Sequence, residues 1–362
     1  MRYVVVLIFF ALNTIYAQQD SLLQVAKKTK DPIEKAGIYL KLVTVTAYSD
    51  SVKAKQYLKQ AERFTPANHK IGQAEIQNSW GYYYMPVNTE KAKEHHLKGI
   101  AILENENSGE AQNLRSKLWF NVAADWQRMG NSKQAMEVLL KTSIPEAQKA
   151  PDKIYLANNY LTVGLIFYND NNLDKAIQYQ EMAVKTVKQL KPSNKTENLY
   201  LTAQFYIAES YLKKENYPKV RAILDGVHAQ YKQKLTDEQL PEFFHLESIY
   251  HLNTGNFKAA LDHANAGLKV AERTGNLYQF VRLTFMKSKA QSNLGHLTEA
   301  AQTLNDLLNN EAYVKNYSTN LSTIYDELWM LEERRGNFKE ALSFAKKESK
   351  FPTVCMPVDK MK

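Results

Sequence analysis

The chain has 362 residues, a length that exceeds one ordinary hydrophobic core and suits either two domains or one elongated array. Hydrophobic residues make up 44% of the chain and charged residues 23%, a balance that excludes an intrinsically disordered protein. The formal net charge is +9, but the lysines are interspersed with glutamates and aspartates, which is typical of a solvated helical surface and argues against a nucleic-acid-binding face. Glycine (13) and proline (10) are scarce, so short turns between helices are favoured over sheets.

The first twenty residues, MRYVVVLIFFALNTIYAQQD, predict a secretory signal. Arg2 supplies the positive end, Tyr3–Leu12 is apolar, and the small Ala17 stands where cleavage is expected. A membrane-spanning helix needs roughly twenty apolar residues, so this shorter stretch favours cleavage over the alternative of an uncleaved N-terminal anchor. We therefore expect residues 1–17 to be removed and the mature chain to be exported, either to the periplasm or out of the cell.

After a lead-in over residues 18–30, the chain repeats one unit eight times over residues 31–350. The units align on a small residue that follows a turn, and successive copies stand 38, 43, 41, 44, 40, 40 and 41 residues apart. The aligned residues are Ala54, Ala92, Ala135, Ala176, Val220, Ala260, Ala300 and Ala341. A period of this length is typical of a repeat array built from one small structural unit.

Each unit has an apolar stripe before the turn and another after it. Tyr160, Gly164 and Phe167 share one helical face in the fourth copy, and Ala176, Tyr179 and Ala183 share the next. The turn itself contains glycine in four copies (Gly130, Gly255, Gly295 and Gly336), which permits the left-handed conformation that ends a helix. Asn131, Asn256 and Asn337 follow as expected N-caps. Each unit is therefore predicted to be a helical hairpin.

The sequence resembles the tetratricopeptide repeat family. YLTVGLIFYNDNNLDKAIQYQEMA (Tyr160–Ala183) and FFHLESIYHLNTGNFKAALDHANAG (Phe243–Gly267) carry its pattern of a large residue, a Gly or Ala, a turn and two alanines. The units are longer than is usual in the family, Trp329 fills a small position of the last copy, and Leu42 fills it in the first. The resemblance implies an all-α, right-handed solenoid of about eight helix-turn-helix repeats.

A second resemblance concerns DSLLQVAKKTKDPIEKAGIYLKL (Asp20–Leu42), which is similar to the start of exported repeat regions in certain bacterial sensor proteins. The membrane and output segments of such proteins do not follow in this sequence. Residues 351–362 are expected to be an irregular tail, because Pro352 and Pro357 block a helix. The tail could cover the last hairpin, leave it open to a partner, or mark a shortened relative of a longer sensor. Cys355, the single cysteine, could pair only between chains.

Motifs for catalysis and for bound groups are missing from the sequence. There is no G-x-S-x-G elbow, no phosphate-binding glycine loop and no H-E-x-x-H pair. His95 and His96 are adjacent on a helix, and His245 and His251 are six residues apart with Glu247 between them. We therefore predict no enzyme, no catalytic residue, no cofactor and no metal site.

The first helix of each pair lines a concave groove in proteins of the resembled family, and residues between the core positions face it. Transferred to this sequence, that rule predicts a peptide- or protein-binding groove of Lys117, Asn121, Arg128, Asn158, Asn169, Phe205, Arg282, Phe285, Lys289 and Asn293. Asparagines and cations suit an extended peptide with carboxylates. The predicted function is a binding scaffold for a protein or peptide partner of the cell envelope, with no nucleic acid involved. The alternative is a sensory or regulatory module of a membrane signalling protein.

Overall fold

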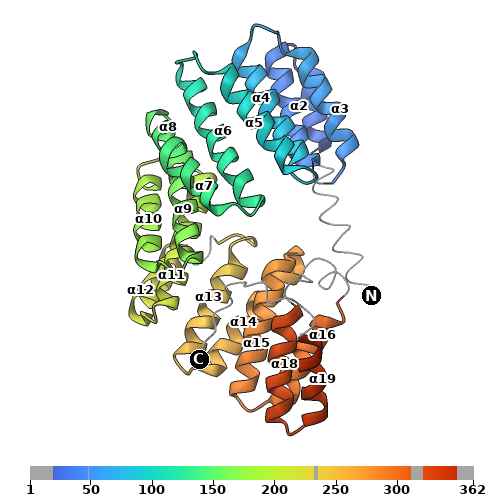
Figure 1. Cartoon of the computed structure of the whole chain (residues 1–362), viewed down its shortest axis with the longest axis vertical. Helices are drawn as coiled ribbons and strands as arrows, with labels where there is room; N and C mark the ends of the chain where they lie inside the picture. Colours follow the sequence, from blue (N-terminus) through green and yellow to red (C-terminus); the bar gives the residue numbers. More distant parts are fainter. Residues whose placement is uncertain (1–18, 48, 232–234, 311–320, 349–362) are drawn as a thin grey trace. The chain divides into compact units, whose positions relative to one another are not determined.

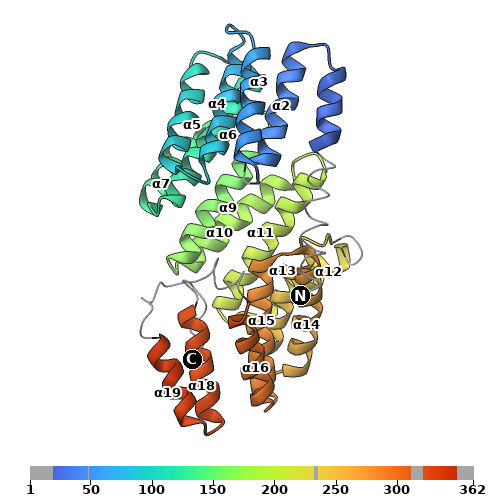
Figure 2. The same cartoon turned by 90° about the vertical axis from the view of Figure 1, so that its right-hand side faces the viewer.

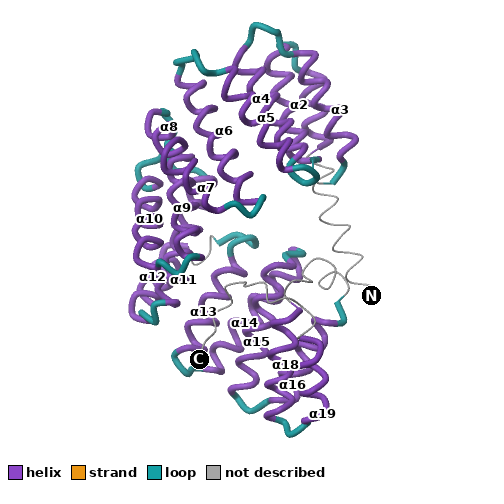
Figure 3. The backbone as a smooth tube through the Cα atoms, in the orientation of Figure 1, coloured by secondary structure: helices purple, strands orange, loops and turns teal. Residues whose placement is uncertain are grey.

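The computed structural model describes residues 19–47, 49–231, 235–310 and 321–348 of the chain. These residues form helices joined by loops, and none of them lies in a strand (Figure 3). Residues 19–28 are helical and precede eight hairpins. The predicted signal segment, the tail and Cys355 lie outside the described residues.

The hairpins follow one another in chain order, as labelled in Figure 1. Their bounds are α2 Pro32–Thr46 and α3 Ser51–Phe64; α4 Lys70–Tyr84 and α5 Thr89–Ile102; α6 Gly109–Arg128 and α7 Ser132–Val138; α9 Ile154–Asn169 and α10 Leu173–Val187; α11 Asn194–Lys213 and α12 Tyr217–Tyr231; α13 Leu240–Asn253 and α14 Phe257–Thr274; α15 Leu277–Asn293 and α16 Leu297–Leu308; and α18 Leu321–Arg334 and α19 Phe338–Glu348. The predicted eight repeats are confirmed.

The aligned small residues all lie inside the hairpins. Seven of the eight are 0% exposed, and Ala341 of the last copy is 3% exposed. Gly164 shows why the first helix also needs a small residue, since a Cβ there would lie 3.1 Å from the carbonyl oxygen of Ala176. The two helices of a hairpin therefore meet backbone to backbone at these positions.

The turns use the conformation that the glycines predicted. Gly130, Gly255, Gly295 and Gly336 have φ between +75° and +85°. Two copies without a turn glycine reach the same region with Asn171 (φ 59°) and Glu215 (φ 56°). After the turn, an asparagine side chain caps the second helix: the side chains of Asn131, Asn172 and Asn256 accept hydrogen bonds from Gln134, Lys175 and Ala259, respectively.

The second helix of the third copy departs from the regular pattern. After α7 it continues through a π turn, η1 (Leu139–Ser143), into α8 (Ile144–Lys149), where Pro145 occupies the first turn. Proline lacks the N–H that an interior helical position donates, so a widened turn just before it keeps the helix continuous.

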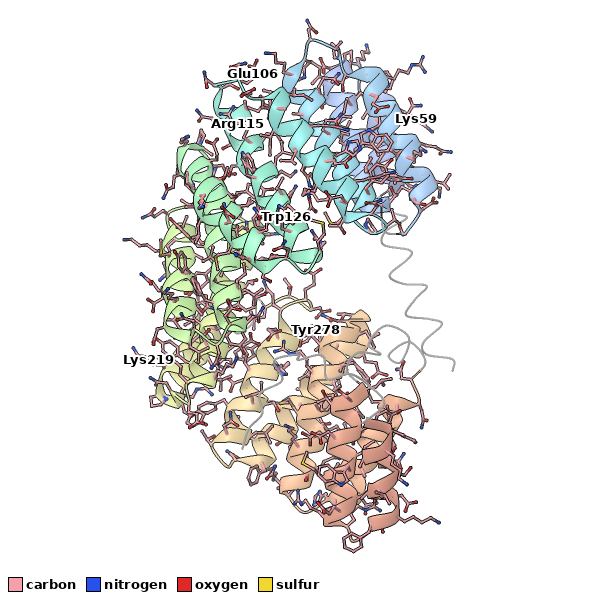
Figure 4. The ribbon with its side chains drawn as sticks, viewed as in Figure 1. Lys59, Glu106, Arg115, Trp126, Lys219 and Tyr278 are labelled. Carbon is pink, nitrogen blue, oxygen red and sulfur yellow. The ribbon has the colours of Figure 1, made fainter. Side chains whose placement is uncertain are left out.

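The chain divides into two compact units, Met1–Ala203 and Gln204–Lys362, and the division falls within α11. In unit 1 the first helices α2, α4 and α6 pack in sequence, and both views show them next to one another (Figures 1 and 2). In unit 2, α13, α14 and α15 pack on one another, followed by α16, α18 and α19. Exposed lysines such as Lys59 on α3 and Lys219 on α12 point away from the ribbon (Figure 4), as the charge pattern predicted. Within the described residues, no helix combines the length and the apolar character needed to cross a membrane.

Candidate functional site

The first helices of unit 1 carry a row of polar and aromatic side chains, which we call the polar strip. It consists of Glu75, Asn78, Tyr82, Lys117, Asn121 and Tyr155. Three of these residues stand on α4 at spacings of three and four, two stand on α6 at a spacing of four, and the last is on α9. Such spacings place the side chains of each helix on one face.

An asparagine pair forms the centre of the polar strip. The Nδ2 atom of Asn121 donates to Oδ1 of Asn78 at 2.8 Å and lies 3.4 Å from the Tyr82 hydroxyl. Asn78 is 3% exposed and Asn121 is 6% exposed. The bond leaves amide hydrogens on Asn78 and the carbonyl oxygen of Asn121 with capacity for a further partner. A nearly buried amide with such capacity favours a ligand that offers both donors and acceptors.

Charges of both signs lie at one end of the polar strip. The Lys117 Nζ atom is 5.7 Å from the centroid of the Tyr82 ring, a cation–π distance. Partial removal from water raises the pKa of Glu75, and the positive charge of Lys117 opposes that rise. Lys117 therefore makes a cation–π contact with Tyr82 and attracts the carboxylate of Glu75 from beyond ion-pair distance.

The other end of the strip is aromatic. The ring of Tyr155 on α9 lies 5.8 Å from Phe120 on α6, and Lys195 Nζ lies 5.3 Å from the Tyr155 ring centroid. Burial raises the pKa of Tyr155, and Tyr82 and Asp152 add to the rise. The phenol therefore stays protonated at neutral pH and is available as a neutral hydrogen-bond donor.

Three other residues that the sequence predicted in unit 1 form no hydrogen bond or ion pair with the asparagine pair within the described part of the chain. The Arg128 side chain is 44% exposed, with its Nη1 atom 3.7 Å from Asp125. Asn158 donates its amide to the Ile154 carbonyl of its own helix, at 2.9 Å. Asn169 is exposed at the end of α9. The structure thus places Lys117 and Asn121 next to Tyr82, whereas Arg128 and Asn158 pair with residues of their own helices.

In unit 2, the predicted groove cation Arg282 is held by carboxylates. Its guanidinium donates to Glu242 at 2.7 and 3.0 Å and to Glu209 at 2.5 Å, and Gln279 donates to Glu242 as well. Burial alone would raise the pKa of Glu242, but Arg282, His245 and Gln279 outweigh it and lower that pKa to about 2. The Arg282 guanidinium carbon is also 5.4 Å from the centroid of Tyr278, which is labelled in Figure 4. This arginine joins α11, α13 and α15 within the protein.

Lys289 is likewise paired, with Glu327 at 3.1 Å, and Asn293 donates to the Lys289 carbonyl of its own helix. Phe205 and Phe285 are 5% and 8% exposed. These two rings are as nearly buried as the asparagines of the polar strip, and the apolar groove contacts predicted for them stay a prediction.

Sequence reasoning missed Glu75, Asn78, Tyr82 and Tyr155. A signal for Asn78 was present, because it precedes Asn121 by 43 residues, the same step that separates Ala92 from Ala135. The two asparagines therefore occupy the same position in successive copies. Tyr155 had no such signal, since an aromatic residue at helical spacing reads equally well as core.

Two clusters of histidine and carboxylate lie in unit 2, although the sequence predicted no metal site. Glu209, Glu242 and His245 bring ligand atoms within 4.8 Å of one another, but the Arg282 guanidinium already binds both carboxylates. In the second cluster, Glu247 and His251 on α13 meet His263 on α14 within the same distance. The sequence could not show this cluster, because His263 comes from the other helix of the hairpin.

Comparison with known proteins identifies the fold. No protein-family model matches the sequence, and no curated protein matches it. Among solved structures, the apo form of the quorum sensor NprR from B. thuringiensis is similar over 96% of both chains, with a TM-score of 0.64 and 11% identity. Aspartyl phosphate phosphatase F from Bacillus subtilis is similar over 100% of this chain and 95% of its own, with a TM-score of 0.60 and 13% identity.

A third similar structure is a tetratricopeptide repeat protein from Parabacteroides merdae, which covers 77% of this chain and 93% of its own with a TM-score of 0.54 and 11% identity. At these identities the likeness concerns the fold. Together with the eight hairpins, the buried alanines and the left-handed turns, it shows that this chain is an all-α solenoid of the tetratricopeptide repeat type.

Proposed function

We propose that the chain is a non-enzymatic binding protein that holds an extended peptide segment on the polar strip of unit 1. The observation that carries this proposal is the Asn78–Asn121 pair, in which two nearly buried amides from neighbouring first helices are joined by a single hydrogen bond. Both amides keep donor or acceptor capacity toward a further partner.

An extended peptide fits this chemistry because its backbone offers N–H and C=O groups at short, regular intervals along its length. Asparagine side chains offer a donor and an acceptor on the same group, so two of them can hold a backbone without regard to its sequence. The strip crosses α4, α6 and α9, and packed helices lie about 8–10 Å apart, so a segment of several residues would span it. Lys117 and Glu75 add charge recognition at one end.

Binding in place of catalysis is supported by the kind of groups present. The polar strip consists of amides, phenols and a lysine beside a glutamate, which recognise backbone and charge. One structurally similar protein is named as a phosphatase and another as a quorum sensor, and both share the fold alone with this chain. The quorum sensor favours, as a second candidate, a sensory module in which peptide binding changes how the array contacts a partner.

Export is part of the proposal. The N-terminal apolar stretch supports a secretory signal that ends near Ala17, which would place the mature chain in the periplasm or outside the cell with a partner of the cell envelope. The residue at which the mature chain begins tests this part of the proposal.

The binding test is selection from a library of random peptides displayed on phage, with the mature chain as bait. We expect the wild-type protein to enrich peptides that the double variant Asn78→Ala/Asn121→Ala does not enrich. For a selected peptide, loss of the two amides should weaken binding about 5- to 100-fold, since a hydrogen bond contributes roughly 0.5–1.5 kcal/mol. The matched control is Gln56→Ala, which removes an exposed amide from the second helix α3 and should leave binding unchanged.

Reversing the charge of Lys117 tests the charged end of the polar strip independently of the asparagine pair. Lys117→Glu should weaken the binding of peptides with an acidic residue and leave the binding of neutral peptides unchanged, with the same helix content by circular dichroism.

Equal enrichment of peptides by the wild type and the double asparagine variant would refute the assignment of the polar strip. Hydrogen exchange with and without the selected peptide then distinguishes the candidates: protection confined to unit 1 supports a scaffold, and a change that extends to unit 2 supports a sensor.

A further inference from the structure

The hairpin of α13 and α14 in unit 2 brings two histidines and a glutamate together. Glu247 and His251 stand four residues apart on α13, and His263 faces them from α14. The His251 and His263 rings are stacked, with centroids 5.3 Å apart and planes inclined by 5°. The Nε2 atom of His251 lies 3.8 Å from Oε2 of Glu247. We propose that Glu247, His251 and His263 form a binding site for a zinc-like divalent cation, which we call the hairpin site.

The donor set selects the class of cation. Two imidazoles and one carboxylate suit zinc and its neighbours in the first transition row, whereas magnesium and calcium prefer oxygen ligands alone. One ligand atom from each residue lies within 4.8 Å of the others. Donors that share a tetrahedral zinc ion stand about 3.4 Å apart, because each bond is about 2.1 Å long. Because the two rings are parallel and an imidazole nitrogen binds a metal in the plane of its ring, one histidine ring must turn about its side-chain bonds to bring the three donors to this spacing, with a fourth position left for water.

The surroundings of the hairpin site resemble those of established metal ligands. Glu247 is 4% exposed and accepts two hydrogen bonds from Arg221, at 2.8 and 2.9 Å. Carboxylates that bind metals are usually held by such outer partners, and an ionised carboxylate keeps lone pairs for a second one. Aromatic rings lie beside both imidazoles. The ring centroids of Phe244 and His263 are 6.0 Å apart, and those of Tyr250 and His251 are 5.2 Å apart, so the two histidines have an apolar shell.

A contrast within the same unit strengthens the assignment. In the cluster of Glu209, Glu242 and His245, the Arg282 guanidinium donates to both carboxylates, so a positive charge already lies between them. At the hairpin site, the Arg221 guanidinium binds both oxygens of one carboxylate, Glu247, and the other two donors are the imidazoles of His251 and His263. A cation there would join the two helices of one hairpin.

The test is calorimetric titration of the untagged mature chain with Zn²⁺ alone. We expect one saturable site that excess Mg²⁺ does not compete for. His251→Gln and His263→Gln should each weaken it roughly tenfold or more. His296→Gln, at an exposed histidine of the same unit, is the matched control and should bind as wild type does. Absence of a saturable site, or unchanged affinity in both ligand variants, would overturn the proposal.

A second measurement applies even where a variant fails to fold. Diethyl pyrocarbonate modifies accessible histidines, and mass spectrometry of peptides locates the modified ones. Zn²⁺ should protect His251 and His263 in the wild-type chain and leave His296 as reactive as before. Equal modification of all three with and without Zn²⁺ would count against the site. The result does not depend on the polar strip, which lies in unit 1, so the two proposals succeed or fail separately.

Discussion

At the scale of single residues, the turns between the helices differ in how well their residues tolerate a positive φ angle. Gly255 has φ of +78°, and a Cβ built there meets no atom within 4 Å, so space does not restrict it. Glu215 adopts nearly the same angle with a side chain that disfavours it. Removing the glycine at position 255 and introducing one at position 215 should therefore change the stability in opposite directions.

We expect Gly255→Ala to lower the free energy of unfolding by about 1 kcal/mol, because alanine is strained at positive φ. Glu215→Gly should raise it by a few tenths to about 1 kcal/mol, since relief of strain exceeds the entropy that glycine adds to the unfolded chain. Asn171→Gly should change it less, because asparagine tolerates this region. Urea unfolding of the three variants gives the comparison, and destabilisation by Glu215→Gly would contradict it.

The buried alanine of each copy predicts a packing penalty. Ala260 is 0% exposed, and its carbonyl accepts a hydrogen bond from Ser248 at 2.9 Å on the facing helix. Ala260→Leu should overpack this contact and lower the free energy of unfolding by about 1–3 kcal/mol. Lys258→Leu on the same helix is exposed and serves as the control. An unchanged midpoint for Ala260→Leu in thermal unfolding would contradict the repeat alignment.

At the scale of helices, the ion-pair network of unit 2 joins three elements through one guanidinium. The pKa of Glu242 is lowered from its ordinary value of 4.5 to about 2, so the folded state binds fewer protons than the unfolded state between these values. The stabilisation is fully present above pH 4.5 and is lost as the pH falls toward 2. Because a shift of one pKa unit corresponds to 1.36 kcal/mol, this lowered pKa contributes at most about 3 kcal/mol to the free energy of unfolding.

Glu242→Gln should therefore remove much of the loss of stability between pH 6 and pH 3. Urea unfolding at the two pH values measures it, with Glu299→Gln, an exposed glutamate of α16, as the control that retains the wild-type acid dependence. Equal acid sensitivity in wild type and Glu242→Gln would show that other groups dominate.

The sequence predicted the hairpins well and the side-chain network poorly, for a physical reason. Hairpins depend on local features such as Gly255 and Ala260, whose spacing is visible in the chain. The Arg282 network depends on three helices whose residues stand 33 and 40 apart (Glu209, Glu242 and Arg282), and only the packed helices decide which of them meet. Of the predicted groove residues, Lys117 and Asn121 lie on the polar strip, whereas Arg282 and Lys289 are paired internally.

At the scale of the whole chain, export predicts a specific mature protein. Removal of residues 1–17 takes away Arg2 as their one charged side chain, so the formal net charge falls from +9 to +8. We expect the intact mass of the protein recovered from the source envelope or medium to correspond to a chain that begins at Gln18. A mass that includes residues 1–17 would support the uncleaved anchor instead.

The asparagine pair has a consequence for selectivity. Side-chain amides that hold a backbone respond to the extended shape of a segment and only weakly to the identity of its residues. A receptor of this kind discriminates among partners chiefly by the repulsive or attractive charge it meets at one end, where Lys117 and Glu75 stand. The polar strip would thus accept many extended segments, and its range of partners would be set by two charged residues.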